Sequence, residues 1–140
     1  MANYYGMTRT NYFAVTDADR FKEIVGKLYG EGKIGYYEHS SEKGKFMFYC
    51  ECNLMGYLEG EDDDDHDSYW DNMVQNLQNI LPEGEAIILT EIGNEKMRYL
   101  TAHSLIITAN STASVDLGMM ALAEAAKVLG NPDYTTQIDY

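Results

Sequence analysis

The residues of this chain whose types and spacing could do chemistry are the acids gathered in residues 59–71. This stretch reads EGEDDDDHDSYWD, with four adjacent aspartates near its centre. Adjacent carboxylates repel one another, and an unpaired charge is expensive to remove from water. The aspartates must therefore face water, a cation or a basic partner, and these three options frame the functional question.

A calcium loop is one interpretation of these acids, because Asp63, Asp65 and Asp67 alternate as in the first half of an EF-hand. The rest of the pattern is missing. Ser68 stands where such a loop needs a glycine for its sharp turn, and Val74 stands where it needs a bidentate glutamate. We therefore predict no metal site, with weak cation binding and a merely solvated loop as open alternatives.

The excess negative charge belongs to one segment of the chain. Residues 46–95 hold thirteen of the 23 acids and no Lys or Arg, while the ten acids elsewhere are balanced by ten basic residues. This segment, the acidic segment, therefore accounts for the whole net charge of −13. It repels phosphate backbones, so direct nucleic-acid binding is disfavoured and a basic protein surface is the favoured partner.

We predict that the acidic loop, residues 59–68, and the start of the helix after it form a partner-binding surface. Its carboxylates would imitate the spacing of phosphates and occupy the basic groove of a nucleic-acid-binding host protein. Aromatic side chains beside the acids would add contact area at low entropic cost. The predicted partner-binding residues are Glu59, Glu61, Asp62, Asp63, Asp64, Asp65, Asp67, Asp71, Tyr57, Tyr69 and Trp70.

The other reactive residue types form no recognisable catalytic or cofactor motif. Cys50 and Cys52 are spaced as C-x-C, not as the knuckle that structural zinc favours, even with His39 or His66 nearby. We expect both thiols to pack in the core. His103 lies mid-strand and is expected to be a core or sheet-face histidine. We therefore predict a non-enzymatic protein without catalytic residues, cofactors or metal.

Hydrophobic periodicity predicts the elements that position the acidic loop within one domain, residues 1–140. Residues 8–15 are typical of a strand, and a helix follows, capped by Thr16 and ending at Gly30. Its apolar face is Phe21, Ile24, Val25, Leu28 and Tyr29. Residues 33–39 and 45–52 are predicted to pair as a hairpin, and 54–58 to extend the meander.

The second half of the chain repeats a helix followed by a hairpin. Ser68 is expected to cap a helix that Pro82 ends, with the buried stripe Trp70, Met73, Val74, Leu77 and Leu81. Strands over 85–92 and 97–108 are apolar on both faces, which favours central positions in the sheet. Residues 110–114 are expected to be a loop, and residues 131–140 a flexible tail.

The resulting order, β-α-β-β-(β)-α-β-β-α, predicts an α+β fold with an antiparallel sheet covered by about three helices. The last helix spans residues 116–129 and is apolar over much of its circumference. We expect it to be core, with a self-association face as the alternative. A homodimer through this helix or the sheet edge is therefore a second interpretation, as a structural or regulatory domain without nucleic-acid mimicry. No long apolar run or leader pattern is present, so a cytoplasmic protein away from membranes is expected.

Three short stretches carry a resemblance to a known group of proteins. They are residues 81–88 (LPEGEAII), residues 93–100 (GNEKMRYL) and residues 129–134 (LGNPDY). In these stretches the chain resembles small acidic proteins carried by phages and conjugative elements of gut Firmicutes. The resemblance implies an accessory role, such as anti-CRISPR or anti-restriction inhibition, in which acidic proteins imitate nucleic acid.

Overall fold

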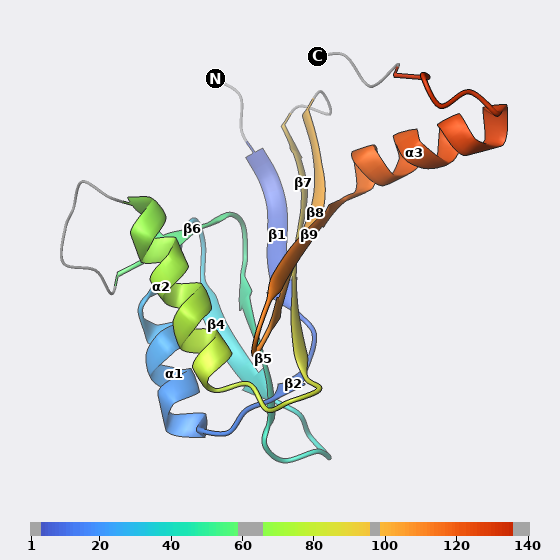
Figure 1. The fold of residues 1–140 in the computed structure, drawn as a ribbon. Helices are drawn as coiled ribbons and strands as arrows, with labels where there is room; N and C mark the ends of the chain where they lie inside the picture. The colour runs from blue at the N-terminus through green and yellow to red at the C-terminus, as the bar shows by residue number, and fades with distance from the viewer. Residues whose placement is uncertain (1–3, 59–65, 96–98, 136–140) are drawn as a thin grey trace.

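The computed structural model describes residues 4–58, 66–95 and 99–135 of the chain (Figure 1). Its elements, in chain order, are β1 (Tyr4–Thr10), β2 (Phe13–Ala14), α1 (Ala18–Gly26), β3 (Leu28–Gly30), β4 (Ile34–Glu38), β5 (Lys45–Cys50), β6 (Leu54–Tyr57), α2 (His66–Asn79), β7 (Ala86–Glu95), β8 (Tyr99–Thr108), β9 (Thr112–Asp116) and α3 (Leu117–Leu129). The three helices and the antiparallel sheet make this an α+β fold, as predicted.

Within the described residues, seven strands form one antiparallel sheet. The strand order is β2-β5-β1-β7-β8-β9, and β4 pairs with β5. The predicted hairpin of β4 and β5 is confirmed, with Tyr36 opposite Phe48. β7 and β8 lie inside the sheet, between β1 and β9, so their predicted central position is also confirmed. β3 and β6 form a separate two-stranded sheet.

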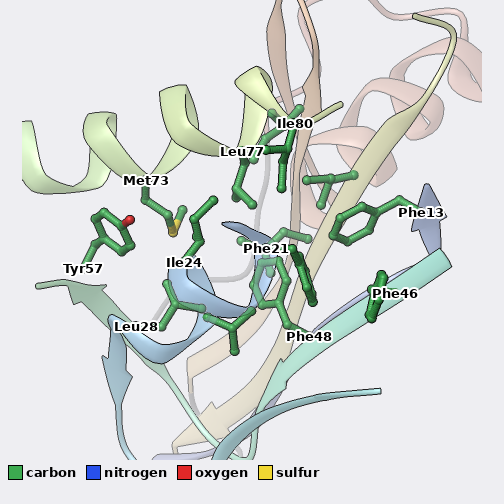
Figure 2. Packing of buried hydrophobic residues seen from close by; sticks show 14 of the residues in the cluster. Phe13, Phe21, Ile24, Leu28, Phe46, Phe48, Tyr57, Met73, Leu77 and Ile80 are labelled. Atoms are coloured by element: carbon green, nitrogen blue, oxygen red, sulfur yellow. The ribbon is translucent and has the colours of Figure 1, made fainter. Parts of the chain in front are cut away.

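The hydrophobic core lies between one face of the sheet and the helices α1 and α2, which Figure 1 shows side by side. Phe21 of α1 is fully buried, and its ring centroid lies 4.9 Å from that of Phe46 and 5.7 Å from that of Phe13. Met73 and Leu77 of α2 point into the same cluster (Figure 2). Burying each such side chain stabilises the fold by about 1.5–3 kcal/mol.

The helices α1 and α2 cover only one of the two faces of the sheet. Along β7, Ile87 and Leu89 are buried against the helices, whereas Ile88 and Ile92 point the other way and are 42% and 55% exposed. Cross-strand partners share a face, so the strand register extends this assignment to β1, β8 and β9. We call the uncovered side the open face; it consists of Tyr5, Met7, Arg9, Ile88, Thr90, Ile92, Asn94, Leu100, Ala102, Ser104, Ile106, Thr108, Ala113 and Val115.

The first predicted strand, 8–15, is divided in the structure because Asn11 interrupts it. The Asn11 side-chain amide donates to the carbonyl of Ala86 over 3.1 Å, and its oxygen accepts from the backbone N–H of Ile88 over 2.7 Å. These bonds replace the regular ladder between β1 and β7, so β1 ends at Thr10 and β2 begins at Phe13.

The first helix is also shorter than its apolar periodicity suggests. Asp17, not Thr16, is the N-cap, because its carboxylate accepts from the N–H of Arg20 over 3.0 Å. The helix ends at Gly26, and Leu28 and Tyr29 belong to β3. β6 does not extend the meander but pairs with β3, where Gly56 lets the Tyr29 ring lie against its backbone. Long-range pairing here overrides helical periodicity.

Two further boundaries in the second half differ from the prediction. α2 begins at His66, before Ser68, and ends at Asn79, consistent with the disfavour of helical geometry just before Pro82. The predicted loop 110–114 instead contributes to β9, which pairs with β8 after a tight turn. In that turn the hydroxyl of Thr108 accepts from the N–H of Ser111 over 3.0 Å.

The boundaries of the last helix agree with the prediction, but its burial does not. Asp116 caps α3 by accepting from the N–H of Met119 over 2.9 Å, and Gly130 ends it at φ 65°. None of the residues of α3 is buried, so the expectation that this helix is core is wrong. The physical reason is its direction, because α3 extends away from the sheet on the side opposite α1 and α2 (Figure 1).

Candidate functional site

Most of the predicted partner-binding surface lies outside the described residues. Glu59, Glu61 and Asp62 to Asp65 fall in residues 59–65, which the structure does not describe. Asp67 and Tyr69 lie in the first turns of α2. The first turn of a helix is a favourable position for acidic residues, because the helix dipole is positive at this end.

The described part of this surface is held by the core. Trp70 is half-buried and packs against the core, whereas Asp71 is exposed. Tyr57 is fully buried, and its hydroxyl accepts from the side-chain amide of Asn76 over 3.2 Å. The prediction that Tyr57 contacts a partner is therefore wrong, because the side chain has no exposed surface. Its hydrogen bond joins β6 to α2, so it fixes the helix that follows the acidic loop.

The other described acids of the acidic segment divide into exposed and structural groups. Glu51, Asp71 and Glu83 are exposed. Glu85 has a structural role, because its carboxylate accepts hydrogen bonds from two backbone groups. These are the N–H of Ala14 over 2.8 Å and the N–H of the next residue, Ala86, over 3.0 Å. Residues 85–86 thereby anchor the start of β7 to β2. The charge available to a partner is thus carried by a part of the segment only.

A polar cluster that the sequence analysis missed lies on the helix-covered side of the sheet, towards the far end of β7 and β8. The hydroxyl of Tyr4 donates to Glu91 Oε2 over 2.6 Å. His103, opposite Glu91 in the register, places Nε2 3.9 Å from Glu91 Oε1. Gly6 and Gly93 are also paired, and a Cβ at either would overlap the Tyr4 side chain. The absence of a side chain at these glycines therefore lets the Tyr4 ring lie over them, on the same face of the sheet, and reach Glu91.

This environment raises the pKa of Tyr4 to about 12, first through burial and then through its hydrogen bond to Glu91. Tyr4 therefore stays a proton donor above pH 10, where an ordinary tyrosine ionises. His103 is 49% exposed and lies on the sheet face, one of the two places predicted for it. Tyr4 and Glu91 are 87 residues apart, so no short motif could have indicated the cluster.

Both cysteines are free thiols held by local structure. Cys50 is buried, and its thiol donates to the carbonyl of Glu31 over 3.1 Å. Burial raises the pKa of this thiol. Cys52 is only half-buried, so the expected core packing applies to Cys50 alone. Among the described residues, no three His, Cys, Asp or Glu side chains gather in a way that could hold a metal ion.

Neither protein-family models, nor curated proteins, nor solved structures gave a match to this chain. In the part of the chain that the structure describes, no helix is both long and apolar enough to cross a membrane.

Proposed function

We propose that this chain is a non-enzymatic acidic binding protein that occupies the basic nucleic-acid-binding groove of a host defence protein. The observation that carries the proposal is the concentration of charge, since residues 46–95 hold thirteen acids and no Lys or Arg. A basic groove built for phosphates attracts such a surface from a distance, and complementary charge raises the association rate more than the final affinity.

The arrangement around α2 supports a presented surface. The helix is anchored by Met73 and Leu77, both fully buried, and by the hydrogen bond from Asn76 to Tyr57. Asp71 is exposed on this anchored helix. Two of the ion pairs between described residues, Arg20 with Glu23 and Lys45 with Glu42, use acids from outside the acidic segment. These pairs do not draw on the charge offered to the proposed partner.

The test is inhibition of DNA cleavage by purified RNA-guided nucleases and restriction enzymes of Firmicutes. We expect the chain to inhibit at least one of them in competition with DNA. Inhibition should weaken by about tenfold or more between low and physiological ionic strength, because exposed charges are screened by salt. Asp62→Asn, Asp63→Asn, Asp64→Asn and Asp65→Asn, combined in one variant, should weaken inhibition by a similar factor.

The matched control removes the same amount of charge from exposed acids outside the acidic segment. It combines Asp19→Asn, Glu23→Gln, Glu31→Gln and Asp133→Asn, all at exposed positions. This variant should inhibit like the unmodified chain. An equal loss of inhibition in both variants would show that inhibition depends on the net charge of the chain and not on the position of the acids. Inhibition that is insensitive to salt and to the Asp62–65 variant, or no inhibition of any enzyme, would overturn the proposal.

A further inference from the structure

The last helix is apolar over much of its circumference, yet none of its residues is buried. Its residues are LGMMALAEAAKVL, in which Glu124 and Lys127 are the charged members. Met119 is 69% exposed and Val128 is 77% exposed. A helix with so little polar surface is typical of a buried position.

A helix of this length also depends on packing for its stability. Isolated helices of fewer than about 12–15 residues are marginal in water even for alanine-rich sequences. α3 has 13 residues, an N-cap and a glycine C-cap, which set its ends but bury no surface. Both the short length of α3 and its apolar composition favour a covering surface from another molecule.

The open face of the sheet is a surface that lacks a helix. Met7, Ile92 and Ala102 are cross-strand neighbours on β1, β7 and β8, and Met7 and Ile92 are exposed. Ile88 and Ile106 form a second apolar pair further along the sheet, beyond the hydrogen-bonded pair of Thr90 and Ser104. β7 and β8 have ten residues each, or about 33 Å, and α3 is about 20 Å long. The helix therefore fits within the length of this face.

The charge of these two surfaces allows a second copy to approach. The chain as a whole has a net charge of −13, which opposes the approach of another copy. The described residues of the open face include Arg9 and no Asp or Glu. Glu124 and Lys127 leave α3 neutral. Self-association is thus electrostatically permitted where the apolar surface lies.

The direct connection to β9 accompanies the direction of α3, which extends away from its own sheet (Figure 1). Asp116 is both the last residue of β9 and the N-cap of α3, so no loop separates the strand from the helix. β9 pairs with β8 and lies at the margin of the sheet among the described strands, which places α3 where it can reach across a neighbouring molecule.

We propose that two copies of this chain exchange α3, each helix packing on the open face of the other copy's sheet. The arrangement is isologous, so one twofold axis closes it as a dimer. It goes beyond the proposed inhibitor function and does not depend on it. The face that carries the dimer is the open one, so α2 with its exposed Asp71 is left for another partner.

The test measures mass in solution by light scattering after size exclusion. We expect twice the chain mass of 15.9 kDa. The helix variant Met119→Lys/Met120→Lys and the sheet variant Ile88→Glu/Ile92→Glu should each have the mass of one chain. All four side chains are exposed in the single chain, so circular dichroism should show the fold retained. Mixing the two variants should restore the double mass, because the lysines of one copy then meet the glutamates of the other.

A control replaces two exposed apolar residues away from both surfaces, Met55→Lys/Leu58→Lys, and should keep the double mass. A single-chain mass for the unmodified protein at high concentration would overturn the proposal. A sheet variant that stays dimeric while the helix variant does not would indicate helix-to-helix contact instead. Failure of the mixed variants to associate would exclude the exchange, and none of these outcomes depends on nuclease inhibition.

Discussion

At the scale of single residues, the structure gives distinct roles to side chains of similar type. Tyr57 is buried, and its hydrogen bond with Asn76 joins β6 to α2. The Tyr4 ring instead lies over two glycines on the face of the sheet and donates to Glu91. Glu85 accepts from two backbone amides, whereas Asp71 is exposed. Composition alone treats these residues as interchangeable tyrosines and acids, and only the surroundings of each separate them.

The raised pKa of Tyr4 predicts an alkaline contribution to stability. An unfolded tyrosine titrates near 10, and in the fold the pKa is about 12, so the folded state holds this proton more tightly. The stabilisation is fully present below pH 10 and is lost as the pH rises through 12. Subtracting the tyrosinate titration of Tyr4→Phe from that of the unmodified chain should leave one group with a pKa near 12.

Glu91→Gln is the control for this titration. It removes the charged acceptor of the Tyr4 hydroxyl, so the pKa of Tyr4 should fall towards 10 while burial keeps part of the shift. A difference titration centred at 10 in the unmodified chain would contradict the hydrogen bond between Tyr4 and Glu91.

At the scale of elements, the fold depends on α1 and α2 covering one face of the sheet. Phe21 is the central contact of α1, and its ring meets those of Phe13, Phe46 and Phe48. Helices of 9 and 14 residues draw most of their stability from such packing. α3 has caps like a stable helix but no intrachain burial, and this contrast motivates the proposed exchange.

Phe21→Ala should lower the free energy of unfolding by about 3–5 kcal/mol, because it removes a fully buried ring and leaves a cavity. Urea denaturation of the chain measures this loss. Phe21→Leu keeps most of the volume and should cost less than about 1.5 kcal/mol, so it covers the case in which the alanine variant does not fold. Lys22→Ala, exposed on the same helix, should change stability by less than about 0.5 kcal/mol. Equal effects at positions 21 and 22 would contradict the packing of α1.

At the scale of the whole molecule, an excess of like charge opposes the compact state. The net charge of −13 is unevenly distributed, with the acidic segment carrying the excess and the open face carrying no acid among its described residues. The same asymmetry distinguishes the two proposals, since a basic partner would be drawn to the exposed acids and a second copy to the open face.

Added salt should raise the melting temperature, because screening reduces the self-repulsion of a chain with this charge. A gain of about 1 kcal/mol corresponds to roughly 2–4 °C in a chain of this size. Thermal unfolding in low and moderate sodium chloride measures the effect, and the combined Asp62–65 variant should show a smaller rise. A melting temperature that falls with salt would indicate that attractive pairs outweigh the repulsion.

The sequence by itself determined the fold class, the hairpin of β4 and β5, the stripe of α2 and both ends of α3. These features follow from periodicity and capping, which act between residues close together in the chain. It also located the excess charge, since charge is a property of composition. The end of α1 was mistaken because its apolar spacing continued into β3, where pairing with β6 prevailed.

Only the tertiary structure decided which apolar surfaces are covered. The burial of Tyr57, the cluster of Tyr4 with Glu91 and the pairing of β9 with β8 all join elements that the sequence cannot place side by side. α3 shows the distinction most clearly. Its apolar composition predicted burial, but burial depends on where the preceding strand directs the helix, and β9 directs it away from its own core.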